Sequence, residues 1–510
     1  MGSPAGRGAS ADSRCQTSFA SAPPVSEANL AGKAVRGTRT SLLGLAAKVG
    51  LQIVGLLVLS RLLSPADFGL VAVPVAAVGV GEVIRDLGLS VAAIQAKELS
   101  ASQRSNLFWA NLVVGVLLCA LYIAASRPIA AAFGSPEAAV ITAVLSSTFV
   151  LNGFAAQFRA SLNRDMRFTA LVVADVVAAT LAIFVAVVLA ANGAGFWAVV
   201  TQYVCSAGVG AVILAAAAQW WPGMPSSLAE SAHLVRFGAS VSAAQVVAYL
   251  GNNADTFVLG FTTTPQRLGL YSRSFQLVVA PLGQFKTPLT TVALPVLSRL
   301  RGDGQRYARY LRVGQAALGY GVIPIAAVAI CAPAALADFA LGPQWSAAVP
   351  VIQVLGAAGA LQQVSYVAYW IFVSHGLGNS LLRYSVVAAV VRTAAILALS
   401  PLGPVGVAWG YVTGSALMWP VALVWSCRMA GVPLRPVLTG AGRIVLCTGT
   451  GVAAAWAAVS ALDAPAILEV LAVPCCFALV YVLAAIVVRP VRMDLLGLWD
   501  LARRFVRRGG

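Results

Sequence analysis

The segment VLSRLLSPADFGL at residues 58–70 recurs as VLGFTTTPQRLGL at residues 258–270, with no gap and at a constant offset of 200 positions. The two copies share Val, Leu, Pro, Gly and Leu at equivalent positions. Pro65 and Gly69 in the first copy correspond to Pro265 and Gly269 in the second. Because proline and glycine mark turns, their recurrence after an apolar stretch indicates an internal repeat rather than chance similarity.

The chain around this repeat is unusually apolar. Its 510 residues are 59% hydrophobic and 10% charged, with a mean hydropathy of +0.86, whereas soluble domains average about 25% charged residues. Apolar stretches of about 20 residues, long enough to cross a hydrocarbon core as helices, recur from Ser41 to Val488. The long alternation of a membrane β-barrel is missing. The sequence therefore predicts an all-α integral membrane protein with about fourteen transmembrane helices.

The basic residues indicate how these spans are oriented. The net charge is +17, and most arginines fall in the even-numbered connections and the C-terminal tail when the N-terminus is placed in the cytoplasm. One such connection holds Arg299, Arg301, Arg306 and Arg309. The positive-inside rule explains this distribution without a nucleic-acid partner and predicts that both termini are cytoplasmic.

The repeat and the charge pattern divide the chain into six regions. An offset of six spans preserves orientation, so we expect two six-helix bundles related by a parallel repeat. The regions are a disordered cytoplasmic tail (1–39), an N-terminal six-helix bundle (40–218), a cytoplasmic linker (219–236), a C-terminal six-helix bundle (237–427), two additional transmembrane helices (428–488) and a basic amphipathic cytoplasmic tail (489–510). The last region is typical either of a helix in the membrane interface or of a frayed basic end.

Several predicted spans contain charged residues. Such residues are costly near the bilayer centre, by about 2.5–3.5 kcal/mol, and usually face a cavity or a partner. Most of them fall in spans one (about 40–60), two (69–94), seven (237–260) and eight (269–297), which the repeat would bring together between the halves. The candidate substrate-binding residues are Lys48, Arg85, Asn252, Arg273, Gln276, Gln284, Lys286 and Arg392, and the candidate ion-coupling or gating residues are Glu82, Asp86, Asp175 and Asp255.

Two interpretations of this set remain open. In the first, the spans enclose a water-filled, mildly cationic cavity that accepts an anionic headgroup, with arginine suited to bidentate phosphate contact and amides to sugar hydroxyls. In the second, Glu82 with Arg85, and Asp255 with a neighbour, are buried pairs that fix helix packing. Glu82, Arg85 and Asp86 lie at i, i+3 and i+4, on one helix face, as either interpretation requires.

Enzyme and metal signatures are missing from the sequence. It contains no G-x-x-x-x-G-K-[ST] and no H-E-x-x-H, and none of its eight cysteines belongs to a C-x-x-C motif. We therefore expect neither catalysis nor a metal or other cofactor.

Several segments resemble a known family. RLLSPADFGL (61–70), DLGLSVAAIQ (86–95), NRDMRF (163–168), NNADTFVLG (252–260) and the run 268–300 resemble the polysaccharide transporter family, which includes colanic-acid-exporter-like lipopolysaccharide and O-antigen flippases. That family belongs to the superfamily of multidrug, oligosaccharidyl-lipid and polysaccharide exporters. The resemblance covers about residues 38 to 490 and implies two six-helix bundles plus two further helices.

The resemblance also implies a function. We expect translocation of undecaprenyl-pyrophosphate-linked oligosaccharide across the bacterial plasma membrane by alternating access, for cell-surface polysaccharide synthesis. The implied partners are this lipid-linked oligosaccharide, membrane lipids, and a polysaccharide polymerase and glycosyltransferases. Two alternatives are a gradient-driven exporter of small amphipathic or cationic compounds, which requires a net acidic cavity, and a non-transporting scaffold for envelope assembly.

Overall fold

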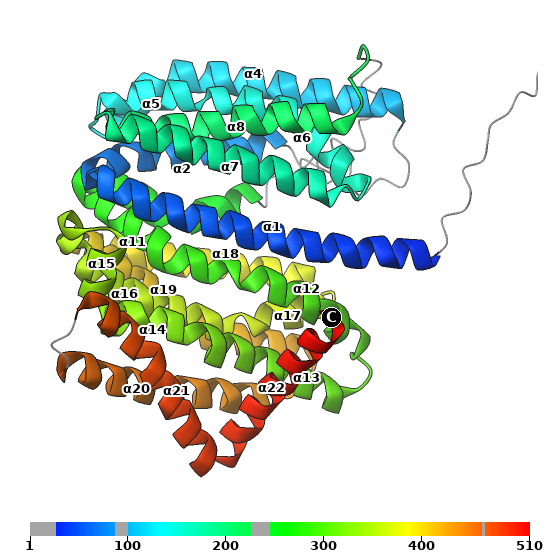
Figure 1. The fold of residues 1–510 in the computed structure, drawn as a ribbon, viewed down its shortest axis with the longest axis vertical. Coiled ribbons are helices and arrows are strands. Elements are labelled where there is room, and N and C mark those ends of the chain that lie inside the picture. The colour runs from blue at the N-terminus through cyan, green and yellow to red at the C-terminus, as the bar shows by residue number, and fades with distance from the viewer. Residues whose placement is uncertain (1–26, 87–99, 226–244, 462–464, 510) are drawn as a thin grey trace, which may run out of the picture.

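The computed structural model describes residues 27–86, 100–225, 245–461 and 465–509, and every regular element in these ranges is a helix (Figure 1). The first half comprises α1 (Glu27–Leu62), α2 (Pro65–Asp86), α4 (Ala101–Ala132), α5 (Glu137–Leu145), α6 (Ser147–Arg164), α7 (Phe168–Ala191) and α8 (Phe196–Ala218). The predicted all-α membrane architecture is confirmed. Residues 1–26 of the predicted tail (1–39) and residues 226–236 of the predicted linker (219–236) lie outside the described residues.

The second half contains shorter and more interrupted helices. They are α10 (Ala254–Thr262), α11 (Pro265–Gln284), α12 (Lys286–Arg299), α13 (Gly304–Ala316), the π-helix η2 (Ala317–Val322), α14 (Ile323–Cys331), α15 (Pro333–Ala340), the 3₁₀-helix η3 (Pro343–Ala348), α16 (Val349–Ser365), α17 (Val367–Ser374), α18 (Gly378–Leu399), the 3₁₀-helix η4 (Ser400–Leu402) and α19 (Gly403–Ala430). The chain ends with α20 (Leu434–Ala461), α21 (Ala466–Val487) and α22 (Arg489–Gly509).

Proline explains one of these interruptions. Pro288 has no N–H to donate to the carbonyl of Gln284, four residues earlier, so the helix ladder breaks between α11 and α12 at Phe285. A second break lies at Asn253, whose Nδ2 donates to the carbonyl of Tyr249 at 2.9 Å. Both breaks fall in spans seven and eight of the predicted repeat.

Eleven helical stretches among the described residues are long and apolar enough to cross a membrane. One of them, Gly378–Ala430, is 53 residues long and contains both α18 and α19. The interrupted segments around α10, α11 and α12 are not among the eleven. The count of fourteen therefore stays a prediction.

The start of the first helix differs from the expectation. α1 begins at Glu27, so residues 27–39 are helical rather than part of a disordered tail. Seven of the 13 residues in the segment EANLAGKAVRGTR are alanine, leucine, lysine or arginine, which have high helix propensity. A helix that is already nucleated in the following apolar span can propagate back through such residues.

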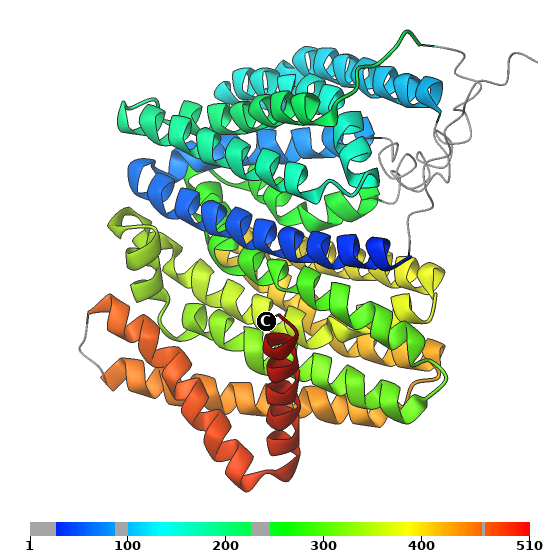
Figure 2. The ribbon, with the colours of Figure 1, turned by 45° about the vertical axis from the view of Figure 1, so that its right-hand side comes forward.

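The two halves meet along α2 and α11. These helices begin at Pro65 and Pro265, the same offset of 200 that relates the sequence repeat, and they pack directly on each other. Figures 1 and 2 show α1 along the boundary between the halves, with α4 to α8 on one side of it and α11 to α19 on the other. The last helices, α20 to α22, cover the far side of the second half (Figure 1).

Candidate functional site

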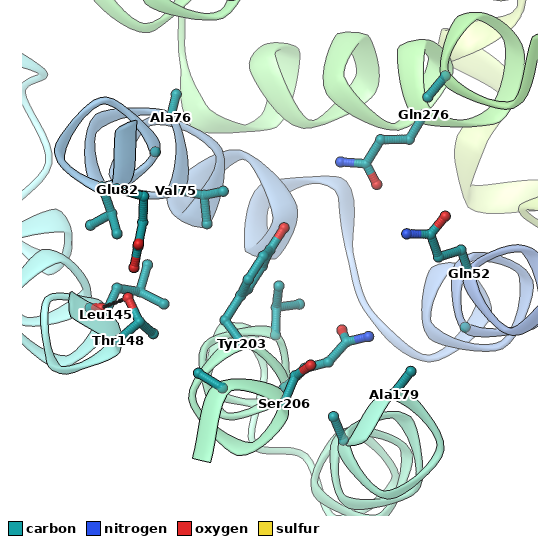
Figure 3. A pocket seen from close by; sticks show the side chains of 18 of the residues that line it. Gln52, Val75, Ala76, Glu82, Leu145, Thr148, Ala179, Tyr203, Ser206 and Gln276 are labelled. Carbon is teal, nitrogen blue, oxygen red and sulfur yellow. Dashed lines mark hydrogen bonds between the residues drawn. The ribbon is translucent and has the colours of Figure 1, made fainter. Parts of the chain in front are cut away.

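A cavity of about 1070 Å³ lies between the two halves. Helices α1, α2, α5, α6, α7 and α8 line it from the first half, and α10 and α11 line it from the second. Figure 3 shows Gln52, Tyr203, Ser206 and Gln276, from α1, α8, α8 and α11, directed into the same space. The lining thus combines amide and hydroxyl groups with small apolar residues.

The cavity is sealed at one end and exposed at the other. At the sealed end, Leu59 is 1%, Phe68 is 5% and Arg273 is 6% exposed. At the other end, the side chains of Lys48 and Arg159 are each 46% exposed. Because Leu59 and Phe68 flank the turn between α1 and α2, the seal lies where the two copies of the repeat meet.

Hydrogen bonds between the halves reinforce this seal. Trp345 Nε1 and Gln344 Nε2 each donate to the carbonyl of Ser60 at 2.8 Å, near the C-terminal end of α1. Arg61 Nη2 donates to the carbonyl of Phe339 at 2.7 Å. The Ser60 carbonyl belongs to the last turn of a helix, where carbonyls have no partner within the helix, so the second half satisfies it.

On α2, Glu82 and Arg85 form an ion pair within the cavity wall. Arg85 Nε lies 2.7 Å from Glu82 Oε2, and Asn152 Nδ2 on α6 donates to Glu82 Oε1 at 2.7 Å. Arg85 Nη1 also donates to Asn111 Oδ1 on α4, at 3.4 Å. These contacts tie α2 to α4 and α6, so the pair stabilises helix packing as well as lining the cavity.

Near the exposed end, Asp175 on α7 is shared by two cations. Arg159 Nη2 lies 2.6 Å from Asp175 Oδ1, and Lys48 Nζ lies 3.8 Å from Oδ2. The three side chains come from α6, α7 and α1. The two cations exceed the one carboxylate, so this cluster carries a local positive charge.

At the sealed end, Arg273 has no carboxylate within 4.0 Å among the described residues. Its Nη1 donates to Gln276 Oε1 at 2.9 Å, and its Cζ lies 3.4 Å from the centre of the Phe68 ring. Its Nε is buried and has no hydrogen-bond partner in the described part of the chain. A buried guanidinium with a spare donor and no counter-ion is suited to bind an anion.

Asp255 lies on α10, beside the break at Asn253. It is 3% exposed, and its Oδ2 accepts a hydrogen bond from the hydroxyl of Tyr271 at 2.7 Å. The backbone N–H of Thr256 donates to Oδ1 at 2.9 Å. Asp255, Asn252 and Tyr271 all line the cavity.

Two of the predicted site residues do not line this cavity. Lys286 lies on α12, where its Nζ donates to Gln362 Oε1 at 3.1 Å and lies 5.2 Å from the centre of the Tyr366 ring. It is next to a separate hollow of about 480 Å³ between α12 and α17. Lys286 lies in predicted span eight, but it follows the break at Phe285 and its side chain is directed away from the cavity.

Arg392 on α18 is the second exception. Its Nη2 donates to the carbonyl of Gly251 at 2.7 Å and to Asn252 Oδ1 at 2.9 Å. Asn252 itself lines the cavity. Arg392 therefore holds the interrupted helix before α10 from behind and is a positioning residue in this structure.

Among the residues that the structure describes, the cavity lining has no formal excess of positive charge, which differs from the expectation. The charged lining residues are the cations Lys48, Arg85, Arg159 and Arg273 and the acids Glu82, Asp86, Asp175 and Asp255. The expectation counted Lys286 and Arg392, which lie elsewhere. The positive character is local instead, at Arg273 and at the cluster around Asp175.

The other ten predicted residues, including Gln276 and Gln284, line the cavity. Arg159, Gln52 and Tyr203 also line the cavity and were not among the predicted residues. Arg159 lies near the C-terminal end of α6, which continues to Arg164. Gln52 and Tyr203 are uncharged, so the insertion penalty does not identify them, and they lie outside spans seven and eight, from which the amides Asn252, Gln276 and Gln284 were predicted.

Comparisons with known proteins agree with this architecture. The family model of a polysaccharide biosynthesis protein matches residues 58–350. The lipopolysaccharide biosynthesis protein WzxC of Escherichia coli (strain K12) is 25% identical over 342 residues, covering 66% of this chain and 69% of that protein. The succinoglycan biosynthesis transport protein ExoT of Rhizobium meliloti (strain 1021) is 26% identical over 403 residues, covering 78% of each.

Solved structures share the fold. The lipid II flippase MurJ, in an inward closed conformation, matches with a TM-score of 0.67 and 11% identity, over 88% of this chain and 99% of that chain. A multidrug resistance transporter of the MATE family, in an inward-facing conformation, matches with a TM-score of 0.59 and 15% identity, over 78% of this chain and 99% of that chain. The model match spans more than half of the sequence and confirms the resemblance seen in its motifs, so the chain belongs to the polysaccharide biosynthesis protein family.

Proposed function

We propose that this protein is a flippase that carries an oligosaccharide linked to polyprenyl pyrophosphate across the bacterial plasma membrane by alternating access. One observation carries the proposal: a polar cavity of about 1070 Å³ between two repeat-related halves, sealed at one end and exposed at the other. Pockets for small molecules are usually about 300–1,000 Å³. The cavity lies at the upper end of this range, which leaves room for a bulky headgroup, and no covalent chemistry is required.

The lining chemistry supports an anionic sugar headgroup. Arg273 offers a buried guanidinium without a carboxylate partner, which suits a phosphate oxygen. Gln52, Gln276 and Ser206 offer donors and acceptors for sugar hydroxyls. The polyprenyl chain would stay in lipid, because transferring so much apolar surface into a polar cavity is unfavourable.

The relatives favour the same cargo class. WzxC and ExoT are named for the biosynthesis of lipopolysaccharide and succinoglycan, the latter as a transport protein, and the structural neighbour MurJ is named a lipid II flippase. Lipopolysaccharide, succinoglycan and lipid II all contain carbohydrate. By extension, glycosyltransferases would supply the cargo and a polysaccharide polymerase would consume it.

The charge rule supports one orientation of the cavity in the membrane. Basic connections predict that the exposed end of the cavity, with Lys48 and Arg159, faces the cytoplasm and that both termini lie there. The seal around Ser60 and Trp345 would then close the opposite side. Cargo would enter from the inner leaflet and leave after the seal opens.

The two alternatives have less support. An exporter of cationic compounds requires a net acidic cavity, whereas the acidic and basic lining residues in the described part of the chain are equal in number. A non-transporting scaffold has no need for a cavity with a buried, unpaired arginine. Both alternatives nevertheless make distinct predictions.

Reconstitution tests the proposal. Purified protein in liposomes is expected to expose an NBD-labelled polyprenyl-pyrophosphate monosaccharide to dithionite reduction on the far leaflet, whereas a labelled amphiphile without phosphate is not moved. Arg273→Gln is expected to slow translocation at least about tenfold, since a charge-assisted hydrogen bond contributes about 1.5–3 kcal/mol. The matched control is Arg306→Gln, which changes an arginine whose side chain is 77% exposed.

Each outcome has a separate meaning. Failure of the wild-type protein to move the labelled lipid would favour the scaffold, and equal transport of the phosphate-free amphiphile would favour the general exporter. Normal transport by Arg273→Gln would overturn the assignment of the anion site while leaving the flippase function intact.

A further inference from the structure

Helix α22 runs across the membrane spans rather than along them. Figure 2 shows this last helix turned across the direction of α20. One face of α22 packs on the protein: Val491 is 2% exposed, and Leu495 and Leu498 pack against the second-half core. A Cβ on Gly497 would lie 3.3 Å from Val313 Cγ2 on α13, so the two helices are in close contact.

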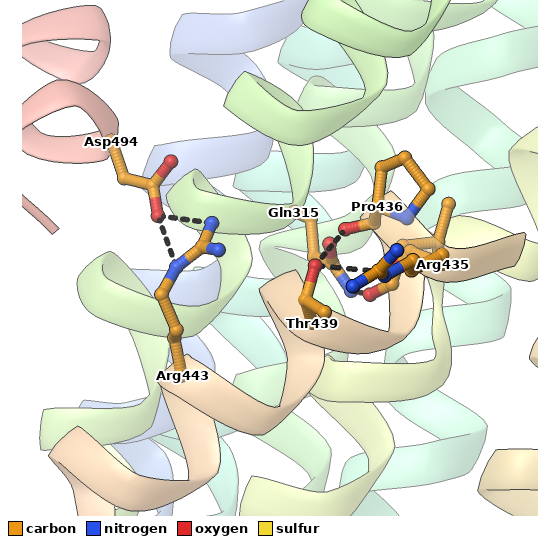
Figure 4. Close-up of polar contacts among 7 residues, drawn as sticks. Gln315, Arg435, Pro436, Thr439, Arg443 and Asp494 are labelled. Atoms are coloured by element: carbon orange, nitrogen blue, oxygen red, sulfur yellow. Dashed lines mark hydrogen bonds and ion pairs between the residues drawn. The ribbon is translucent and has the colours of Figure 1, made fainter. Parts of the chain in front are cut away.

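An ion pair fixes the rotation of α22 about its axis. Asp494 is 5% exposed, and its Oδ2 accepts hydrogen bonds from Arg443 Nη2 at 2.9 Å and Nε at 3.3 Å (Figure 4). Arg443 lies in the third turn of α20, near the end where that helix begins. Breaking a buried ion pair by removing one partner is strongly destabilising, so the opposite face of α22 is held outward.

The outward face combines apolar side chains with arginines. Arg492, Leu496, Trp499 and Arg503 are exposed and lie at i, i+4, i+7 and i+11, on one helix stripe. Met493, Leu496 and Trp499 are 59%, 55% and 56% exposed. Arg503 Cζ lies 4.9 Å from the centre of the Trp499 ring.

We propose that this outward face of α22, with Arg489, Arg492 and Arg503 around Leu496 and Trp499, binds anionic phospholipid headgroups at the membrane surface. A helix that lies across the spans is oriented for the plane of the interface. Tryptophan is enriched at that depth, and guanidinium groups pair with lipid phosphates. If this face instead bound a protein partner, Leu496 and Trp499 would lie outside the lipid, and brominated lipid would not quench Trp499.

The first measurement locates Trp499. Full-length protein and its Trp499→Phe variant are placed in nanodiscs of phosphatidylcholine and phosphatidylglycerol, with or without bromine on the acyl chains near the headgroup. The fluorescence difference between the two proteins reports Trp499. Strong quenching of this difference by brominated lipid is expected, and an unquenched signal would overturn the proposal in favour of water or a protein partner at this face.

The second measurement tests the charge. The association of spin-labelled phosphatidylglycerol with nanodiscs of the full chain is compared for the wild type, Arg492→Gln and Arg489→Gln/Arg492→Gln. Each arginine removed is expected to lower the preference for phosphatidylglycerol over phosphatidylcholine about fivefold, since a basic residue at an anionic surface contributes about 1 kcal/mol. Arg306→Gln, an exposed arginine at the start of α13, is the control. An equal loss in the control, or no loss in the α22 variants, would overturn the proposal.

Discussion

Gly69 and Gly269 face each other where α2 crosses α11, and each lies against the proline that opens the other helix. A Cβ on Gly69 would overlap the carbonyl oxygen of Pro265, and a Cβ on Gly269 would overlap the carbonyl oxygen of Pro65. Each added Cβ would also lie 3.0 Å from the backbone nitrogen of the other glycine. The relationship is reciprocal, as expected where two copies of a repeat meet around a pseudo-two-fold axis.

Alanine at either glycine is therefore expected to separate the two halves. The clash is with backbone, which cannot rotate away, so Gly69→Ala or Gly269→Ala should lower the stability of the sealed state by about 1–3 kcal/mol or more. Thermal unfolding in detergent, followed by tryptophan fluorescence, measures this. The control is Gly50→Ala on α1, where an added Cβ meets nothing within 4 Å. Equal melting temperatures for all three variants would contradict the close crossing.

The seal should weaken when Trp345 loses its hydrogen bond. Trp345→Phe keeps an aromatic ring near Phe68, whose ring centre is 5.8 Å away, but leaves the Ser60 carbonyl without the indole donor. Gln344 Nε2 still donates to this carbonyl, so the variant loses one of two hydrogen bonds, worth about 0.5–1.5 kcal/mol, and amide exchange in the last turn of α1 is expected to accelerate. Hydrogen–deuterium exchange measures this in peptides that contain residues 56–64.

A second tryptophan provides the control for that experiment. Trp456 is 60% exposed on α20, so Trp456→Phe should leave exchange in residues 56–64 unchanged. If both variants behave alike, the bond to Ser60 does not hold the seal closed.

The ion pair on α2 should show strong energetic coupling. Glu82→Gln leaves the Arg85 charge, whose side chain is 9% exposed, without its carboxylate, and Arg85→Gln leaves Glu82 with Asn152 as its remaining partner. The double variant is expected to be more stable than the sum of the two single losses, with a coupling energy of about 0.5–3 kcal/mol. Equilibrium unfolding of the four proteins completes this cycle.

The translocation assay then separates two roles for this pair. If Arg85 mainly fixes packing, the double variant should translocate lipid-linked sugar near the wild-type rate. A stable double variant without transport would instead make Arg85 a ligand of the cargo.

The repeat and the composition contained enough information for the fold and for most of the cavity. Pro65, Gly69 and their partners predicted where the halves meet, and the insertion penalty identified charged residues that had to face a cavity. The same penalty does not identify the uncharged residues Gln52 and Tyr203. The sequence also does not specify how far a helix turns at a break. The orientation of Lys286, just after the break at Phe285, could therefore not be predicted from it.

Lys286 and Arg273 should consequently respond in opposite ways to neutralisation. Lys286 bonds Gln362 on α16, which in turn donates to the hydroxyl of Tyr411 on α19 at 3.0 Å, so Lys286→Gln removes a link that joins three helices and should lower the melting temperature. Its effect on translocation at permissive temperature should be less than about threefold, because the cavity lining is unchanged. Arg273→Gln removes an unpaired buried charge and should affect stability little but transport strongly. Measuring melting and translocation for both variants distinguishes the two positions, and loss of transport in a fully stable Lys286→Gln protein would show that cargo passes through the hollow between α12 and α17.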